Sequence, residues 1–162
     1  MGMRMRTGDS HPSEDIRGVY SEGVWYCMGM GMRMGNDEIR KSEYIHTFKD
    51  LDTWKQGHVI VLEVYRCTKT YPREEQFGLV NQMRRAAISV TSNIAEGFGR
   101  QTGKDKAQFY TIAKGSLLEL QSQLQASLDL GYIPKDTHES LDALLERAVR
   151  VTYGLIRSAN GQ

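Results

Sequence analysis

The segment from residue 82 to residue 100, which reads QMRRAAISVTSNIAEGFGR, carries more apolar surface than one side of one helix needs. At 100° per residue its apolar side chains form a stripe, and further apolar residues widen that stripe around one flank. The stripe consists of Val80, Met83, Ala87, Val90, Ile94 and Phe98, and the flank of Phe77, Ile88 and Ala95. This width predicts a helix that packs inside its own domain and also against a second surface, most simply another copy of the chain.

Three other segments after residue 46 show the same helical period. The first runs from Phe48 to a stop at Tyr71-Pro72, and a capping pair, Thr102 with Asp105, opens the third. Gly131 marks the end of the third segment, and Pro134 suits the start of the fourth. The expected core stripes are Leu51, Trp54, His58, Val61, Leu62 and Tyr65 in the first, Tyr110, Ala113, Leu117, Leu120, Leu124 and Leu128 in the third, and Leu141, Leu144, Ala148, Val151 and Leu155 in the fourth.

Four helices of about 20 residues joined by short loops leave little choice of topology, because a short loop places consecutive helices antiparallel. Residues 47–162 are therefore predicted to fold as an all-α, antiparallel, up-down-up-down four-helix bundle. Residues 1–46 differ in composition, since seven of the eight methionines lie in the first 34 residues, interspersed with glycine. Alternating Gly and Met neither holds a helix nor builds a uniform apolar face, which predicts a largely unordered, low-complexity extension. An alternative is that residues 1–33 are not native coding sequence and that Met34 is the start.

Composition narrows the classes of function. The formal net charge is +1, and residues 47–162 hold fifteen Lys and Arg against thirteen Asp and Glu, so any basic site has to be local. Neither a run of about 18 apolar residues nor the apolar stretch of a secretion signal is present, which predicts a cytoplasmic protein with no membrane partner. Cys27 and Cys67 have neither a disulfide nor a metal spacing, and no cofactor or metal is expected.

Two helix faces are candidates for an oligomer interface. The third helix carries a mixed small and apolar face opposite its core stripe, with Ile112, Gly115 and Glu119. The second helix carries a polar stripe of Arg85, Ser89, Ser92 and Glu96, whose serines would let another backbone approach. A pairing of Arg85 with Glu96 or Glu119 across the contact would complete this interface.

The chain does not contain a recognisable catalytic constellation. Residues 97–104 look superficially like a phosphate loop but lack the G-x-x-x-x-G-K-[ST] spacing and a preceding strand. No Ser-His-acid, paired-carboxylate or Cys-His arrangement can be assembled, so an enzyme is not expected. Basic residues do bracket the start of the third helix, where the helix dipole favours a phosphate oxygen. The predicted nucleic-acid-binding residues are Arg84, Arg85, Arg100, Lys104 and Lys106.

Several segments together resemble the S23-like family of bacterial four-helix-bundle proteins, encoded within intervening sequences of 23S ribosomal RNA genes. They are Phe48-Lys49-Asp50-Leu51, Trp54-Lys55-Gln56-Gly57-His58, Tyr71-Pro72, Arg84-Arg85-Ala86-Ala87, Asn93-Ile94-Ala95-Glu96-Gly97 and Gly115-Ser116-Leu117 with Glu119. The resemblance covers roughly residues 48–158 and implies a left-handed bundle that assembles into a homopentamer. A related branch is similar to the accessory variability determinant of diversity-generating retroelements, which implies nucleic acid and a reverse transcriptase as partners.

Two functions follow from these observations. In the first, the oligomer is a non-enzymatic scaffold that binds RNA or DNA, because basic residues repeated around a ring form a multivalent patch. In the second, it is a protein-interaction scaffold, for example a reverse transcriptase accessory protein, and does not bind nucleic acid directly. Aromatic side chains interleaved with the basic ones would favour the first.

Overall fold

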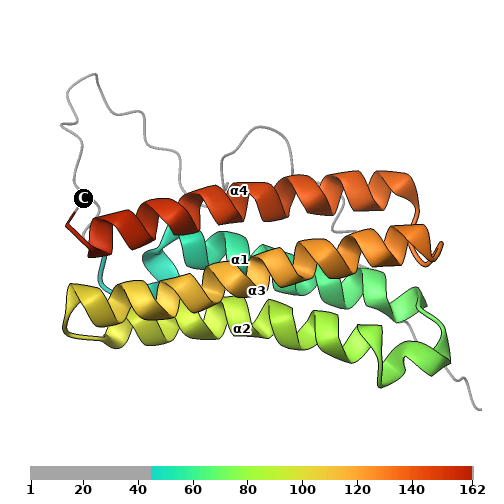
Figure 1. Cartoon of the computed structure of the whole chain (residues 1–162), viewed down its shortest axis with the longest axis horizontal. Coiled ribbons are helices and arrows are strands. Elements are labelled where there is room, and N and C mark those ends of the chain that lie inside the picture. The colour runs from blue at the N-terminus through green and yellow to red at the C-terminus, as the bar shows by residue number, and fades with distance from the viewer. Residues whose placement is uncertain (1–44, 162) are drawn as a thin grey trace, which may run out of the picture. The chain divides into compact units, whose positions relative to one another are not determined.

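The computed structural model describes residues 45–161, and within them the chain is helical without strands. The four helices are α1 (Asp52–Cys67), α2 (Leu79–Gly99), α3 (Gly103–Asp129) and α4 (Lys135–Ala159). Three short 3-10 helices, Phe48–Asp50, Thr68–Thr70 and Arg73–Gln76, precede α1 and link it to α2. Successive long helices run in opposite directions (Figure 1), so the all-α, four-helix prediction is confirmed. The left-handed sense stays a prediction, and the predicted unordered extension lies outside the described residues except for Ile45 and His46.

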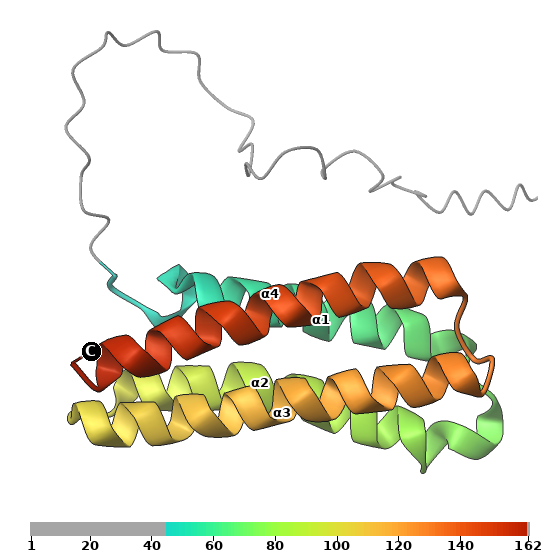
Figure 2. The same ribbon diagram turned by 45° about the horizontal axis from the view of Figure 1, so that its top comes forward.

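The four helices form a closed ring in which each one packs against two neighbours. The pairs in contact are α1 with α2, α2 with α3, α3 with α4, and α4 with α1. Figure 2 looks onto α3 and α4, with α2 behind α3 and α1 behind α4. The largest side chains with no appreciable exposure are Ile60, Val64, Val80, Met83, Val90, Ile94, Leu117, Leu120, Leu124 and Leu145. One continuous core therefore runs along the bundle axis, as the stripes of α2 and α3 predict.

The helix ends follow local rules that the sequence displays. The Thr102 side chain accepts a hydrogen bond from the Asp105 backbone N–H at 3.1 Å, which caps α3. Gly131 adopts a positive φ of 73°, and the Tyr132 N–H bonds the Ser127 carbonyl at 2.9 Å, which closes the C-terminus of α3. Pro134 lies immediately before α4. These three boundary predictions are confirmed.

The predicted core stripe of the first helix is confirmed in part. Leu51, just before α1, and Val61 are buried, and Trp54 packs against the core. The other buried residues of α1 are Thr53, Gly57, Ile60 and Val64, which lie outside the predicted stripe. Leu62 and Tyr65 remain 45% and 40% exposed. His58 is exposed and stacks on the ring of Trp54, with centroids 5.0 Å apart. The apolar and aromatic residues of α1 extend around more than one side, and the contacts with α2 and α4 select the side that carries Gly57 and Ile60.

We predict that Gly97→Ala destabilises the bundle by about 1–3 kcal/mol, the usual cost of forcing an extra methyl into a packed core. A Cβ at Gly97 would lie 2.6 and 2.9 Å from two ring carbons of the buried Tyr110. Gly99→Ala is the matched control, because a Cβ there meets nothing within 4 Å. Urea unfolding followed by circular dichroism measures both free energies. Equal stability of the two variants would contradict the close contact between α2 and α3.

Candidate assembly and nucleic-acid surfaces

The line of contact between α2 and α3, which we call the α2–α3 seam, determines which predicted interface residues are engaged within the subunit. Ser116 Oγ of α3 donates to Ser89 Oγ of α2 at 2.9 Å, and Asn93 Nδ2 donates to the Ser89 carbonyl at 2.8 Å. Ser89 is half-buried in this seam, so its hydroxyl is engaged within the subunit. This hydrogen bond shows that Ser89 and Ser116 lie at the same level of the two antiparallel helices.

Six of the seven predicted interface residues lie fully outside that seam and are exposed: Arg85, Ser92, Glu96, Ile112, Gly115 and Glu119. We call these six the α2–α3 face. Ile112 is 46% exposed, and a Cβ built on Gly115 meets nothing within 4 Å. Glu119 Oε1 accepts a hydrogen bond from Gln123 at 2.9 Å, and Glu96 forms an ion pair with Arg100. Within residues 45–161, Arg85 has no ion-pair partner.

The five predicted nucleic-acid-binding residues divide into two groups. Arg84 and Arg85 lie in the second turn of α2, whereas Arg100 follows its last residue, and Lys104 and Lys106 open α3. Fifteen residues of helix separate the two groups, which corresponds to about 22 Å. One subunit therefore presents two separate basic positions and does not bring the five residues into one patch.

Three of these basic side chains contact aromatic rings. Arg84 Nε donates to Thr68 Oγ1 at 3.0 Å, and its guanidinium lies over the Tyr65 ring at 4.8 Å. Besides its ion pair with Glu96, Arg100 lies over the Phe109 ring at 4.5 Å, and Lys106 Nζ lies 5.9 Å from the Phe98 ring centre. Such contacts hold the side chains on the bundle surface. Arg85 and Lys104 are the two exposed members without such a partner among the described residues.

A third basic surface lies on α3 and α4 and was missed from the sequence. Lys114 Nζ lies 5.7 Å from the ring centre of Tyr153, which is 54% exposed. Arg150 and Arg157 belong to the same side of α4 by their spacing of three and four residues from Tyr153. In the sequence these residues are recognisable only as members of the polar sides of two amphipathic helices. The packing of α3 against α4 is needed to show that they belong to one surface.

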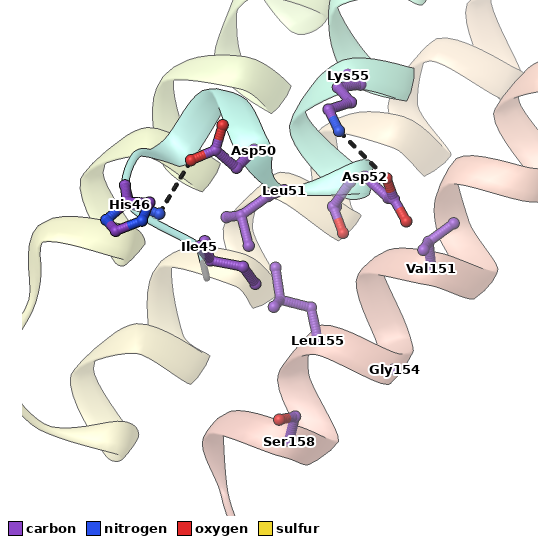
Figure 3. Close-up of a pocket in the computed structure, with 11 residues that line it drawn as sticks. Ile45, His46, Asp50, Leu51, Asp52, Lys55, Val151, Gly154, Leu155 and Ser158 are labelled. Carbon is purple, nitrogen blue, oxygen red and sulfur yellow. Dashed lines mark hydrogen bonds and ion pairs between the residues drawn. The ribbon is translucent and has the colours of Figure 1, made fainter. Parts of the chain in front are cut away.

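An open groove of about 800 Å³ lies between the start of α1 and the end of α4. Figure 3 shows Leu51, Val151 and Leu155 among its lining residues, with Asp50 and Asp52 on the α1 side. Asp50 Oδ2 accepts from the backbone N–H groups of His46 and Thr47 at 2.9 and 2.8 Å, and these hydrogen bonds lower the Asp50 pKa. Asp52 pairs with Lys55 at 3.7 Å. Both carboxylates therefore serve local structure, and the groove does not contain a free acid-base pair.

Among the described residues, burial raises the pKa of two titratable groups at and just after the end of α1. Burial, with the nearby Glu63 carboxylate, raises the pKa of the Cys67 thiol to about 11, which makes it a poor nucleophile at neutral pH. Burial also raises the Tyr71 pKa to about 12. No group of three or more His, Cys, Asp or Glu side chains is placed to hold a metal ion in the part of the chain that the structure describes. In the same part, the helices are too short or too polar to cross a membrane.

Comparison with known proteins gives a family and a fold. The sequence pattern of the family described as 23S rRNA-intervening sequence protein matches residues 49–154. A crystal structure of a protein with unknown function, from the S23 ribosomal protein family of Bacteroides thetaiotaomicron VPI-5482, is similar with a TM-score of 0.62 and 20% sequence identity. The similarity covers 67% of this chain and 98% of that one, and at this identity it shows the fold. No curated protein matches the chain.

The contacts of the two adjacent arginines generate a prediction. Arg84→Ala removes the hydrogen bond to Thr68 and the contact with Tyr65, so we expect it to lower the free energy of unfolding by about 1 kcal/mol. Arg85→Ala removes a side chain that is exposed within the subunit, so its effect on the fold itself should be less than about 0.5 kcal/mol. Urea unfolding of both variants, at a protein concentration low enough to separate the subunits, gives the comparison. A loss for Arg84→Ala no larger than that for Arg85→Ala would contradict the stabilising contacts of Arg84 with Thr68 and Tyr65.

Proposed function

The chain belongs to the 23S rRNA-intervening sequence protein family, and we propose that its bundle is the subunit of a non-enzymatic scaffold that assembles with copies of itself and binds nucleic acid. One observation carries the proposal. The α2–α3 face combines an exposed isoleucine, an open glycine and charges of both signs, whereas other basic side chains, such as Lys104, do not belong to this face. The first surface suits a copy of the chain, and the second suits a phosphate backbone.

The proposed self-assembly is argued from the positions of opposite charges on the α2–α3 face. Arg85 lies four residues before Ser89, and Glu119 three residues after Ser116. Because those two serines are hydrogen-bonded across antiparallel helices, Arg85 and Glu119 lie at nearly the same level along the bundle. In a head-to-tail ring, the α2 side of one subunit meets the α3 side of the next, and opposite charges at one level pair across that contact. We propose a homopentamer of this kind.

The binding step rests on repetition of a few basic residues. One subunit offers too few contacts for useful affinity, since Arg85 is used in the proposed subunit contact and Lys104 is the other exposed member without an aromatic partner among the described residues. A closed ring repeats Lys104 in every subunit, and contacts to several phosphates of one strand add to the affinity. RNA and DNA share the phosphate chemistry that these side chains recognise, so the binding should depend strongly on salt and weakly on sequence.

A second candidate function is a protein-interaction scaffold, such as an accessory protein of a reverse transcriptase, without direct nucleic-acid binding. The contacts of Arg84 and Arg100 favour it, because both guanidinium groups are partly engaged with side chains of their own subunit. The two functions differ in one measurable property. The scaffold without nucleic-acid binding assembles but does not retain labelled RNA or DNA at low salt.

Assembly is tested by sedimentation of the full chain at micromolar concentration, where we expect an oligomer of about five subunits. Gly115→Leu should reduce the oligomer to smaller species while helicity stays unchanged, because the leucine fills the space that a neighbouring backbone occupies. Gly154→Leu is the matched control, since a Cβ on this glycine of α4 also meets nothing within 4 Å. A monomeric unaltered protein, or equal behaviour of the two variants, would contradict assembly through the α2–α3 face.

Nucleic-acid binding is tested by fluorescence anisotropy with labelled single-stranded RNA, single-stranded DNA and duplex DNA. We expect dissociation constants on the order of micromolar at 50 mM salt, and a loss of at least about tenfold at 200 mM, because several phosphate contacts release counterions. The slope of log affinity against log salt counts those contacts. Assembly without binding at the lower salt concentration would leave the protein-interaction scaffold as the function.

A further inference from the structure

The outward side of α3 and α4 brings together basic residues that are far apart in the sequence. Gln121 Nε2 of α3 donates to Asp142 Oδ1 of α4 at 3.2 Å, and Lys114 lies beside Tyr153. At the end of the pair, Gly103 lies so close to Ala159 that a Cβ would be 2.1 Å from the Ala159 carbonyl oxygen. These contacts fix the register of the antiparallel pair (Figure 2), so Lys104 and Arg157 lie at the same end. We call Lys104, Lys114, Arg150, Tyr153 and Arg157 the α3–α4 face.

This face has an excess of positive charge within a nearly neutral chain. Arg150 has one acidic partner, Glu146, at 3.7 Å, and the side chains of that pair are 71% and 58% exposed. Such an exposed pair is weak and is readily exchanged for another anion. Lys104 and Arg157 have no ion-pair partner among residues 45–161. The ten residues from Lys104 to Lys114 span about 15 Å of helix, and the two lysines lie about 80° apart around its axis, so the positive charge is spread over a broad area.

Tyr153 is the aromatic residue of the α3–α4 face. Its side chain is 54% exposed in the C-terminal half of α4, and Lys114 Nζ of α3 lies 5.7 Å from the centre of its ring. A half-exposed ring of this kind contributes little to the core, whose α4 members are Leu141, Leu145, Ala148 and Thr152. An aromatic ring flanked by basic side chains is the arrangement on which unpaired bases stack while their phosphates contact the charges.

We propose that the α3–α4 face binds single-stranded nucleic acid, with a base stacked on the ring of Tyr153 and the phosphates on either side contacting Lys104, Lys114, Arg150 and Arg157. The proposal deepens the proposed function and rests on it, because it assigns the surface and the form of the nucleic acid. A base within a duplex is paired and stacked, so a duplex reaches the charges of this face but not the ring. Assembly through the α2–α3 face leaves α4 on the outside of the ring, where a strand can pass from one subunit to the next.

Stacking of a base on the Tyr153 side chain is tested in the full-length protein with a labelled single-stranded RNA 20-mer, its DNA counterpart and a duplex of the same length. Tyr153→Leu should weaken single-strand binding about tenfold, the usual effect of removing one stacking side chain, and should leave duplex binding within about twofold. Tyr153→Phe keeps the ring and should bind like the unaltered protein. Circular dichroism and sedimentation of each variant confirm that fold and oligomer size are unchanged. A loss in Tyr153→Phe equal to that in Tyr153→Leu would overturn stacking.

The charges are tested by neutralisation. The double variant Lys114→Gln with Arg157→Gln should reduce the slope of log affinity against log salt by about 1.4, which is the contribution of two phosphate contacts on a single strand. Arg147→Gln is the matched control, because Arg147 is exposed and, six residues before Tyr153, lies about 120° away from it around the axis of α4. If the unaltered protein binds and all these variants bind equally well, the face is wrong and the proposed function stands. If the unaltered protein does not bind at low salt, the proposed function fails and this inference with it.

Discussion

The bundle depends on how closely α2 approaches the helices on either side of it. A Cβ on Gly57 of α1 would lie 3.2 Å from the side chains of Val90 and Thr91, and one on Gly97 of α2 would overlap the Tyr110 ring of α3. Along the same helix Met83, Ala87, Val90 and Ile94 are almost completely buried. Because the inner side of α2 is filled in this way, its orientation about its own axis is fixed. The outward positions of Arg85, Ser92 and Glu96 follow from that orientation, and so does the surface that we assign to assembly.

The sequence predicts the helices well because their signals are local. A helix period, a proline before a first turn and a glycine after a last one act within a few residues, which is why the cap at Thr102 and the end at Gly131 were predicted correctly. Which side of a helix is buried is a property of its neighbours. In α1 the predicted stripe includes Leu62 and Tyr65, yet both remain substantially exposed because the contact with α2 forms at Gly57. In α4 the core uses Leu145 and Thr152, each one residue after the predicted Leu144 and Val151.

The candidate site was less accessible to sequence reasoning because its chemistry depends on partners from other elements. Arg84 was expected to be available to a phosphate, but its guanidinium contacts Thr68 and Tyr65, which precede it by 16 and 19 residues along the chain. Ser89 was expected at a subunit contact and is hydrogen-bonded to Ser116 within the subunit. In each case the residue type was recognised and its neighbour was not. Period and spacing describe one helix, whereas these contacts require the register of two.

Net charge is a poor guide to function in this bundle, because acids and bases are not paired evenly over its surface. Five acidic side chains of residues 45–161 form an ion pair with a base three or four residues away along the chain, as Glu63 does with Arg66, Glu96 with Arg100 and Glu139 with Lys135. Where such a pair lies, the positive and the negative charge cancel and the surface has no local net charge. The bases that remain include Lys104 and Arg157, which lie at the same end of the α3 and α4 pair and contribute to one excess of positive charge. Assembly repeats that excess without altering the charge balance of any subunit, so a nearly neutral chain can present an electrostatically strong surface once several copies lie side by side.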